Sequence, residues 1–168
     1  NRPELHLAAD RLVVFESGTG RLWIVPVATL VDFDAESEPT LTLGTGAAIS
    51  VDPEGLLFGY SPSAGLLYRL DVTASEDPTT QAVDIGDPTG AVSITSVDGH
   101  WAILDPDTQT VHLDGRPVAL ADLIGSAAIP VLAWPSAAGD RLLVGYSGGL
   151  LSVPLSGAAA VEIGRAHV

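Results

Sequence analysis

The chain of 168 residues is long enough to build one domain with a hydrophobic core, since 46% of its residues are hydrophobic and only 17% are charged. Its formal net charge of −14 disfavours binding to nucleic acid and to anionic lipid surfaces, which repel an acidic protein. The absence of cysteine excludes disulfides, thiolate metal sites and thiol redox chemistry. The sequence contains no run of about 18 apolar residues, which is the length that would predict a membrane-spanning helix.

Four similar apolar hairpins follow one another along the chain, and each is punctuated by Gly, Pro, Asp or Ser. Their leading apolar residues are Leu12, Leu56, Trp101 and Leu142, separated by 44, 45 and 41 residues. A second marker, an aliphatic residue followed by glycine, recurs with spacings of 42, 39 and 39 residues, at Leu43-Gly44, Ile85-Gly86, Ile124-Gly125 and Ile163-Gly164. Two markers with nearly one period indicate an internal repeat.

A repeat of about 40 to 50 residues made only of strands is typical of a β-propeller. We therefore predict an all-β, propeller-like fold of four four-stranded antiparallel blades, forming part of a larger propeller. The predicted blades span about residues 3–45, 46–90, 91–129 and 130–168 of one domain. Because the chain begins at Asn1 without Met, we expect it to be a piece of a longer protein.

Each repeat divides into four short strands. In the second repeat we predict strands at 47–52, 56–60, 65–72 and 81–86, and in the fourth at 129–135, 141–146, 149–155 and 160–164. Middle strands are continuously apolar, as expected for strands covered on both faces, whereas the outermost strands alternate and should face water. The only predicted helical turn lies around 119–124, where Pro117, Gly125 and Pro130 prevent a longer helix.

The stretch Gly145-Tyr146-Ser147-Gly148-Gly149 matches the G-x-S-x-G nucleophile elbow of serine hydrolases. That elbow requires a helix after the serine, and here the apolar run 149–155 predicts a strand. The same place in the second repeat reads Gly59-Tyr60-Ser61, followed by proline. We therefore interpret Ser147 as a hairpin-turn residue, with Gly149 and its counterpart Gly65 supplying positive φ angles. Only Glu162 and His167 follow as possible triad partners.

Two groups of acidic residues are candidate metal ligands. Asp32, Asp34, Glu36 and Glu38 alternate as in a calcium loop, but Ser37 and Leu43 stand where an EF-hand loop needs Gly and Glu. We favour a solvated insertion between the third and fourth strands of the first blade. The second group follows the innermost strands and lies in turns that would crowd one mouth of a propeller channel: Asp10, Asp52, Asp98 and Asp140. Turn formation explains each Asp locally, so Ca²⁺ at Asp32, Asp34, Glu36, Asp52 or Asp98 is the weaker alternative.

No catalytic or cofactor-binding residue is predicted. The histidines His6, His100, His112 and His167 lack zinc-site spacing, and no glycine-rich loop leads into a helix. We expect Trp23, Trp101 and Trp134 to lie within strands and to pack between blades.

The hairpins at 20–26 and 65–71, "GRLWIVP" and "GLLYRLD", resemble the repeat core of quinoprotein-like (PQQ-type) propellers. More broadly, the strands at Arg11–Phe15 and Arg141–Val144, the stretch 50–65 and the aliphatic-Gly ends resemble the propeller region of large actinobacterial surface proteins that carry fibronectin type III or Ig-like repeats. This resemblance implies an extracytoplasmic, membrane-tethered and non-enzymatic protein. The residues that bind the quinone in those propellers have no counterpart that can be placed in this sequence.

Three functions follow as hypotheses. The first is a non-catalytic interaction or scaffold module at the cell envelope, with a protein or envelope partner. The second is a metal-dependent hydrolase or lactonase with its site in the propeller channel. The third is a carbohydrate-binding module, suggested by Trp and Tyr at strand ends. If the chain is half of a ring, the outer faces of the first and last blades should be apolar, and the protein should form a homodimer through them.

Overall fold

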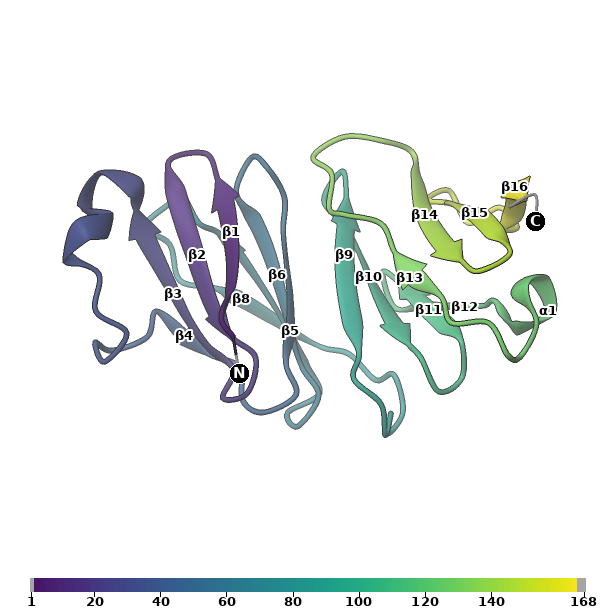
Figure 1. Cartoon of the computed structure of the whole chain (residues 1–168), viewed down its shortest axis with the longest axis horizontal. Coiled ribbons are helices and arrows are strands. Elements are labelled where there is room, and N and C mark those ends of the chain that lie inside the picture. The colour runs from purple at the N-terminus through teal and green to yellow at the C-terminus, as the bar shows by residue number, and fades with distance from the viewer. Residues whose placement is uncertain (1, 166–168) are drawn as a thin grey trace. The chain divides into compact units, whose positions relative to one another are not determined.

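A computed structural model describes residues 2–165, with the backbone alone for Arg165. The chain divides into two compact units, Asn1–Val83 and Asp84–Val168, and each contains two four-stranded antiparallel sheets (Figure 1). In every sheet the four strands are neighbours in chain order, which is the meander of a propeller blade. The predicted all-β fold of four four-stranded blades is confirmed.

The first unit holds sheets of strands β1 to β4 and β5 to β8. The first sheet contains β1 Glu4–Ala8, β2 Arg11–Glu16, β3 Arg21–Pro26 and β4 Leu41–Thr42. The second contains β5 Ala48–Val51, β6 Leu56–Ser61, β7 Leu66–Asp71 and β8 Thr79–Ala82. Between β3 and β4 a short 3-10 helix, η1 Val27–Asp32, begins the insertion that ends at Thr40. The acidic stretch thus lies in an insertion between the third and fourth strands, as predicted.

The core of the first unit forms where these two sheets face each other. Phe15 and Leu22 of the first sheet and Leu57 of the second are fully buried and belong to one apolar cluster. The sheets approach closely, because a Cβ on Gly59 would lie 2.8 Å from Cδ1 of Leu43. Side chains on β2 and β3 alternate, so that Val13 and Phe15 point into this core while Leu12 and Val14 lie on the outer face.

The second unit repeats the arrangement. Its sheets contain β9 Ser93–Val97, β10 His100–Asp105, β11 Thr110–Leu113 and β12 Arg116–Ala119, then β13 Val131–Leu132, β14 Arg141–Tyr146, β15 Gly149–Pro154 and β16 Val161–Arg165. A single helical turn, α1 Ala121–Ile124, follows β12 where the sequence predicts one. The core joins both sheets and includes Val111, Leu142 and Leu151, all fully buried or nearly so.

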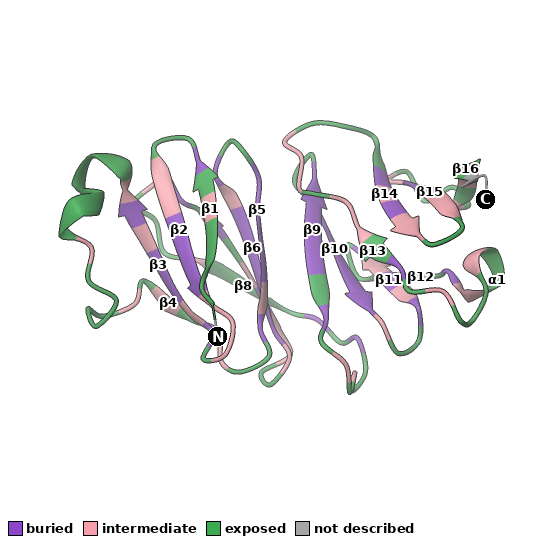
Figure 2. Cartoon of the chain, viewed as in Figure 1, coloured by how far each residue is buried: buried purple, intermediate pink, exposed green. Residues whose placement is uncertain are grey.

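Burial in the second and third blades follows the predicted gradient. The second strands β6 and β10 are buried at five of six positions, whereas the fourth strand β8 is exposed throughout (Figure 2). In the fourth blade only two of the six residues of β14 are buried. Apolar side chains therefore concentrate in the middle strands of the second and third sheets, whose outer strands face water.

The hairpin between the second and third strands uses one turn geometry in three blades. The residue just before the third strand adopts a left-handed conformation, with φ of 71° at Gly20, 61° at Gly65 and 50° at Gln109. Its carbonyl accepts a hydrogen bond from Leu43, Val83 or Leu120, which starts the return of the chain. Glycine adopts this conformation without steric cost, whereas Gln109 needs added contacts.

Some strand boundaries differ from the prediction. The first strand of the fourth blade was predicted at 129–135 and spans only β13, and the fourth strand of the second blade lies at β8 rather than at 81–86. The aliphatic-Gly marker is also offset between blades, since the structural counterpart of Leu43 is Val83, two residues before Ile85. Among residues 2–165, no helix is long and apolar enough to cross a membrane.

Candidate functional site

Ser147 lies in a two-residue turn. The turn Ser147-Gly148 joins β14 to β15, closed by the pair Tyr146 and Gly149, and a strand rather than a helix follows. Gly149 has φ of 157°, positive as predicted but close to extended. The tighter constraint falls on Gly148, where a Cβ would lie 2.5 Å from Cε2 of Tyr146. The structure therefore supports the turn interpretation against the nucleophile elbow.

The predicted triad partners do not support the elbow either. The carboxylate of Glu162 accepts a hydrogen bond of 3.0 Å from the Tyr146 hydroxyl, which ties β16 to β14. His167 lies outside the described residues.

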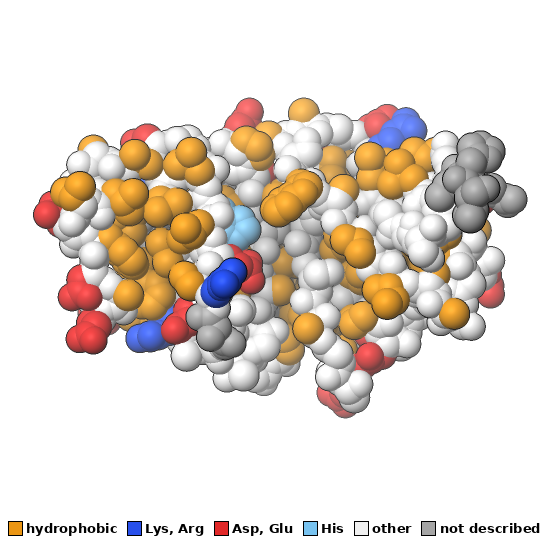
Figure 3. Space-filling model, viewed as in Figure 1, with side chains coloured by type: hydrophobic (Ala, Val, Ile, Leu, Met, Phe, Trp, Pro, Cys, Tyr) orange, Lys and Arg blue, Asp and Glu red, His pale blue; other side chains and the backbone are white. Residues whose placement is uncertain are grey.

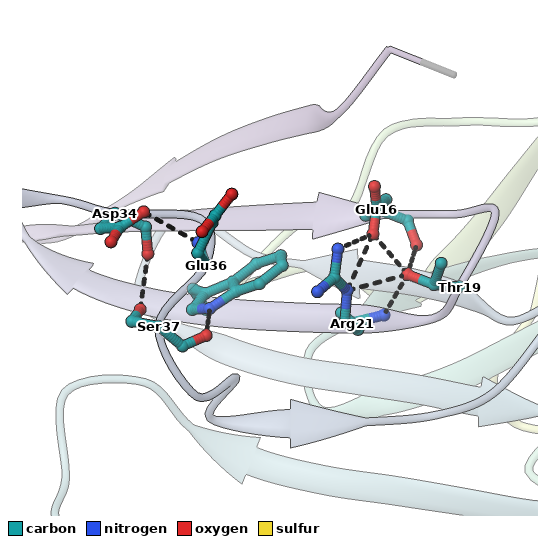
Figure 4. A network of polar contacts seen from close by, with 7 residues as sticks. Glu16, Thr19, Arg21, Asp34, Glu36 and Ser37 are labelled. Carbon is teal, nitrogen blue, oxygen red and sulfur yellow. Dashed lines mark hydrogen bonds and ion pairs between the residues drawn. The ribbon is translucent and has the colours of Figure 1, made fainter.

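The acidic insertion is held by hydrogen bonds among Asp34, Glu36 and Ser37 (Figure 4) and by an aromatic contact of Phe33. Asp34 accepts a bond of 2.9 Å from the Glu36 amide at its Oδ1, and its carbonyl accepts one of 2.6 Å from the Ser37 hydroxyl. The Trp23 indole donates to the Ser37 carbonyl at 3.1 Å, and its ring meets Phe33 edge to face at 6.1 Å. The insertion thereby packs on the outer face of β3. Asp34 closes a local turn, while the exposed Asp32 ends η1.

A network of charged residues lies next to the acidic insertion, on the hairpin between β2 and β3 (Figure 4). The Arg21 guanidinium donates to Glu16 at 2.8 Å and lies 5.1 Å from the centre of the Trp23 ring. Hydrogen bonds from Thr19 and then from Arg21 lower the pKa of Glu16. This network orders the hairpin and places the Arg21 cation against the Trp23 ring.

The four turn aspartates make different contacts. Asp52 is 3% exposed, and its Oδ1 accepts backbone N–H bonds from Glu54, Gly55 and Leu56 at 2.9 to 3.0 Å. Asp98 has φ of 49° in the β9–β10 turn, and its backbone N–H donates to Ser136. Asp10 and Asp140 each pair with the following arginine, Arg11 or Arg141. Of the four, the Asp52 side chain binds the backbone of its own turn, as the turn interpretation requires.

Within residues 2–165, no three His, Asp or Glu side chains are grouped so that they could hold a metal ion. Calcium binding by Asp32, Asp34, Glu36, Asp52 or Asp98 stays a prediction, which melting of the protein in Ca²⁺ and in EDTA tests.

The histidines form isolated pairs rather than a site. His100 and Asp114 bond at 2.5 Å from two turns at one end of the third sheet, with both side chains about half exposed. His6 lies 3.5 Å from Glu4 on β1. His112 is partly buried, and that burial lowers its pKa, which favours the neutral ring.

A pocket of about 300 Å³ opens in the first unit between its two sheets. The apolar part of its lining, its floor, comes from Ile24 and Leu41 of the first sheet and from the buried Leu70 and Val72 of the second. The loop 74–78, Arg11 and Thr40 also line the pocket. Sequence reasoning missed this pocket because its lining comes from four separate segments, none of which carries a motif.

Trp134 does not pack between blades, which corrects the sequence-based prediction. Its side chain is 86% exposed in the segment that follows β13. The backbone around it is diverted toward β9, because Ser136 exchanges bonds of 2.9 and 3.0 Å with Ser96 and Asp98, and the Thr95 hydroxyl donates to the Ala133 carbonyl at 2.7 Å. Trp23 and Trp101 are 4% and 5% exposed, and both lie within strands as predicted.

The outer faces of the terminal sheets are apolar. On β1, Leu5 and Leu7 are 62% and 69% exposed and share a face with Leu12 and Val14, to which they are paired. Figure 3 shows hydrophobic side chains gathered over β1 to β3. The insertion covers this face only around Trp23, so that its β1 side stays open.

The last sheet has a similar open face. Val131 of β13 and Val161 of β16 are 62% and 50% exposed, and Ile163 is 50% exposed. Through their pairings, Val131 lies opposite Gly145 and Val161 opposite Ser152, on the face away from the buried Val144 and Leu151. Leu143 continues the apolar surface between them. One side of the sheet thus carries the core, and the other carries Val131, Leu143 and Val161 around the buried Ser152.

Comparison with solved structures supports the propeller fold. No protein-family model matches the chain, and no curated protein sequence matches it. A solved structure of a catalytically inactive virginiamycin B lyase from Staphylococcus aureus with quinupristin matches with a TM-score of 0.60 at 12% identity, over 95% of this chain and 54% of the lyase. A selenomethionine-substituted form of the lyase matches with a TM-score of 0.59 at 11% identity over the same shares. The chain spans about half the length of these propeller proteins, and its four sheets are propeller blades.

Proposed function

We propose that the chain is a non-catalytic interaction or scaffold module that associates through the outer faces of its terminal blades. The observation that carries this function is the exposure of Leu5 and Leu7 on the first sheet and of Val131, Val161 and Ile163 on the last. Contiguous exposed apolar surface is typical of protein interfaces. A propeller blade normally has both faces covered, so each open face accepts a further sheet.

The partner that we propose is a second copy of the chain. The outer faces of the first and last sheets carry exposed aliphatic side chains, among them Leu5 and Leu7 on β1 and Val131 and Val161 on the last sheet. The chain spans 54% of a lyase propeller, and a second copy spans as much again. The homodimer therefore pairs the first sheet of one copy with the last sheet of the other.

Site-specific photocrosslinking tests this function. p-Benzoylphenylalanine in place of Val161 should crosslink two copies of the purified protein, and the crosslinked peptide should come from β1 of the partner. The same replacement of Thr80, an exposed residue on β8 of the second sheet, serves as the control. No crosslink at 161, or equal crosslinking at 80, would contradict association through the terminal faces.

The proposal places this module outside the cytoplasm, as the resemblance to surface proteins implies. Protease added to intact cells that express a tagged form should then degrade the tag, while a cytoplasmic marker survives. Survival of the tag would place the module inside the cell.

A lyase is the second candidate function, favoured by the fold match over 95% of the chain. Incubation with quinupristin, followed by mass spectrometry, decides between the two. An unchanged quinupristin spectrum is expected for an interaction module, and conversion that increases with protein concentration would favour the enzyme.

A further inference from the structure

The pocket of the first unit has the composition of a site for an amphiphilic ligand. Its floor is built from Ile24, Leu41, Leu70 and Val72, and the last two are 6% and 3% exposed. A volume of about 300 Å³ accommodates an extended aliphatic chain of five or six carbons. The floor can therefore bind the stem of such a ligand but offers it no charged group.

The charges stand at the rim and are not balanced. Arg11 is paired with Asp10 at 2.8 Å, which offsets its positive charge. Glu76 and Asp77 are exposed on the loop 74–78, and neither forms an ion pair within residues 2–165. The mouth of the pocket thus has a net negative charge above an apolar floor.

We propose that this pocket binds a primary ammonium group on an aliphatic stem, with the stem on the floor and the cation between Glu76 and Asp77. Amphipathic cations of this kind bury the methylene chain and keep the charged end in water. The whole protein adds to the attraction, because its net charge of −14 raises the local concentration of cations. The ligand is a lysine side chain of a partner or a free alkylamine. The site lies between sheets within the first unit, apart from the terminal faces, so it does not depend on the proposed function.

Titration of the ¹⁵N-labelled full chain tests the site with three probes of equal length: hexylamine, hexanol and hexanoate. Hexylamine at pH 7 should shift the backbone amides of Leu41, Val72 and Ser75, and the shifts should weaken with added salt. Hexanol and hexanoate should cause smaller shifts or none. Equal shifts with hexanol would show an apolar pocket without cation selectivity, and an absence of shifts at these amides with hexylamine would overturn the site.

Two sets of variants make the test specific. The double variant Glu76→Gln, Asp77→Asn should raise the Kd for hexylamine about fivefold, in the range of exposed charge pairs. The double variant Glu54→Gln, Asp87→Asn removes the same charge from exposed positions outside the pocket and should leave the Kd within twofold of wild type. An equal change in both would mean that only net charge matters, which contradicts the site.

Ala74→Phe fills the pocket from its loop wall and should abolish the shifts without altering the melting temperature. Binding of hexylamine that survives this variant would place the ligand elsewhere. N-acetyl-lysine methylamide then distinguishes the two sources of the cation. Binding of this blocked lysine assigns the pocket to a partner's side chain, and binding of hexylamine alone assigns it to a free amine.

Discussion

The hydroxyl of Ser147 is exposed in a tight turn that a strand follows. Nothing in that geometry raises its nucleophilicity, so Ser147→Ala should change the free energy of unfolding by less than about 1 kcal/mol, as at ordinary surface sites. A fluorophosphonate probe should leave the wild-type protein unlabelled. Stoichiometric labelling that disappears in Ser147→Ala would restore the elbow interpretation.

A second residue-scale prediction concerns Gly65, whose φ of 61° places it in the left-handed region. Gly65→Val should lower the free energy of unfolding by more than about 1 kcal/mol, because a β-branched residue is strained there. Gly164→Ala is the control, since Gly164 has no left-handed φ and nothing lies within 4 Å of its added Cβ. Chemical denaturation that finds the two variants equally stable would mean that the turn geometry is wrong.

The third concerns Asp52, which is buried and accepts three backbone N–H bonds at one oxygen. Asp52→Ala leaves those donors without their acceptor and should cost about 1–3 kcal/mol of unfolding free energy. Asp87→Ala, at an exposed aspartate, should cost far less. Equal melting temperatures for the two variants would show that the Asp52 carboxylate does not stabilise its turn.

At the scale of elements, the insertion between β3 and β4 is held to its sheet by an aromatic contact. Phe33→Ala removes the edge-to-face partner of Trp23 and should destabilise the protein by about 1–3 kcal/mol. Trp23 fluorescence should also shift to the red as water reaches the ring. Val31→Ala, at a 93% exposed position of the same insertion, should do neither. Identical spectra for Phe33→Ala and wild type would show that the insertion does not cover Trp23.

A loop and a hairpin of the second unit are joined through one carboxylate, and their contact depends on pH. Asp107 accepts bonds from the Thr89 side chain and from the Thr89 and Gly90 amides, which hold its pKa below the usual value. A lowered folded-state pKa stabilises the fold above the unfolded-state pKa of about 3.9, and this stabilisation is lost as pH falls through the folded-state value.

Wild type should therefore be more stable than Asp107→Asn at pH 7, and the difference should shrink as the pH falls below about 4. Urea denaturation of both proteins from pH 7 to pH 3 measures it. A difference that stays constant over this range would mean that ionised Asp107 does not hold the loop.

The elements that could be predicted from the sequence were those whose pattern of apolar residues matches their place in the fold. The apolar run 56–60 became a buried second strand, because its pattern suits a strand covered on both faces. The run 141–146 also formed a second strand, but only two of its six residues are buried. The helical turn at 121–124 followed from the prolines and glycine around it. Periodicity over the whole chain therefore predicted the blades well.

Features that depend on contacts distant in sequence could not be predicted. Trp134 sits in an apolar run that reads as a strand, yet Ser136 pairs with β9 and ends β13 after two residues. Gln109 occupies a position where the other hairpins use glycine, and its side chain donates to carbonyls of 125–128, which no local pattern reveals. The pocket likewise forms only when β3, β4, β7 and a loop come together.

At the scale of the whole molecule, charge repulsion and apolar burial have opposite effects on association through the terminal blades. Its net charge of −14 opposes association, whereas burial of Leu5, Leu7, Val131 and Val161 favours it at roughly 25 cal/mol per Å² of apolar area. Association should therefore strengthen with added salt, which screens the repulsion and leaves the apolar term intact. A dimer held by charge pairs would weaken instead.

Light scattering after size exclusion at tens of micromolar tests whether the protein associates through its terminal faces. We expect twice the 17.2 kDa mass of the chain for wild type and for the control Thr80→Glu, at an exposed position of β8 in the second sheet. We expect the mass of a single chain for Val161→Glu, which places a charge on the open face of the last sheet. A wild-type protein that elutes as a monomer, with one cooperative melt and no binding of a hydrophobic dye, would contradict this association.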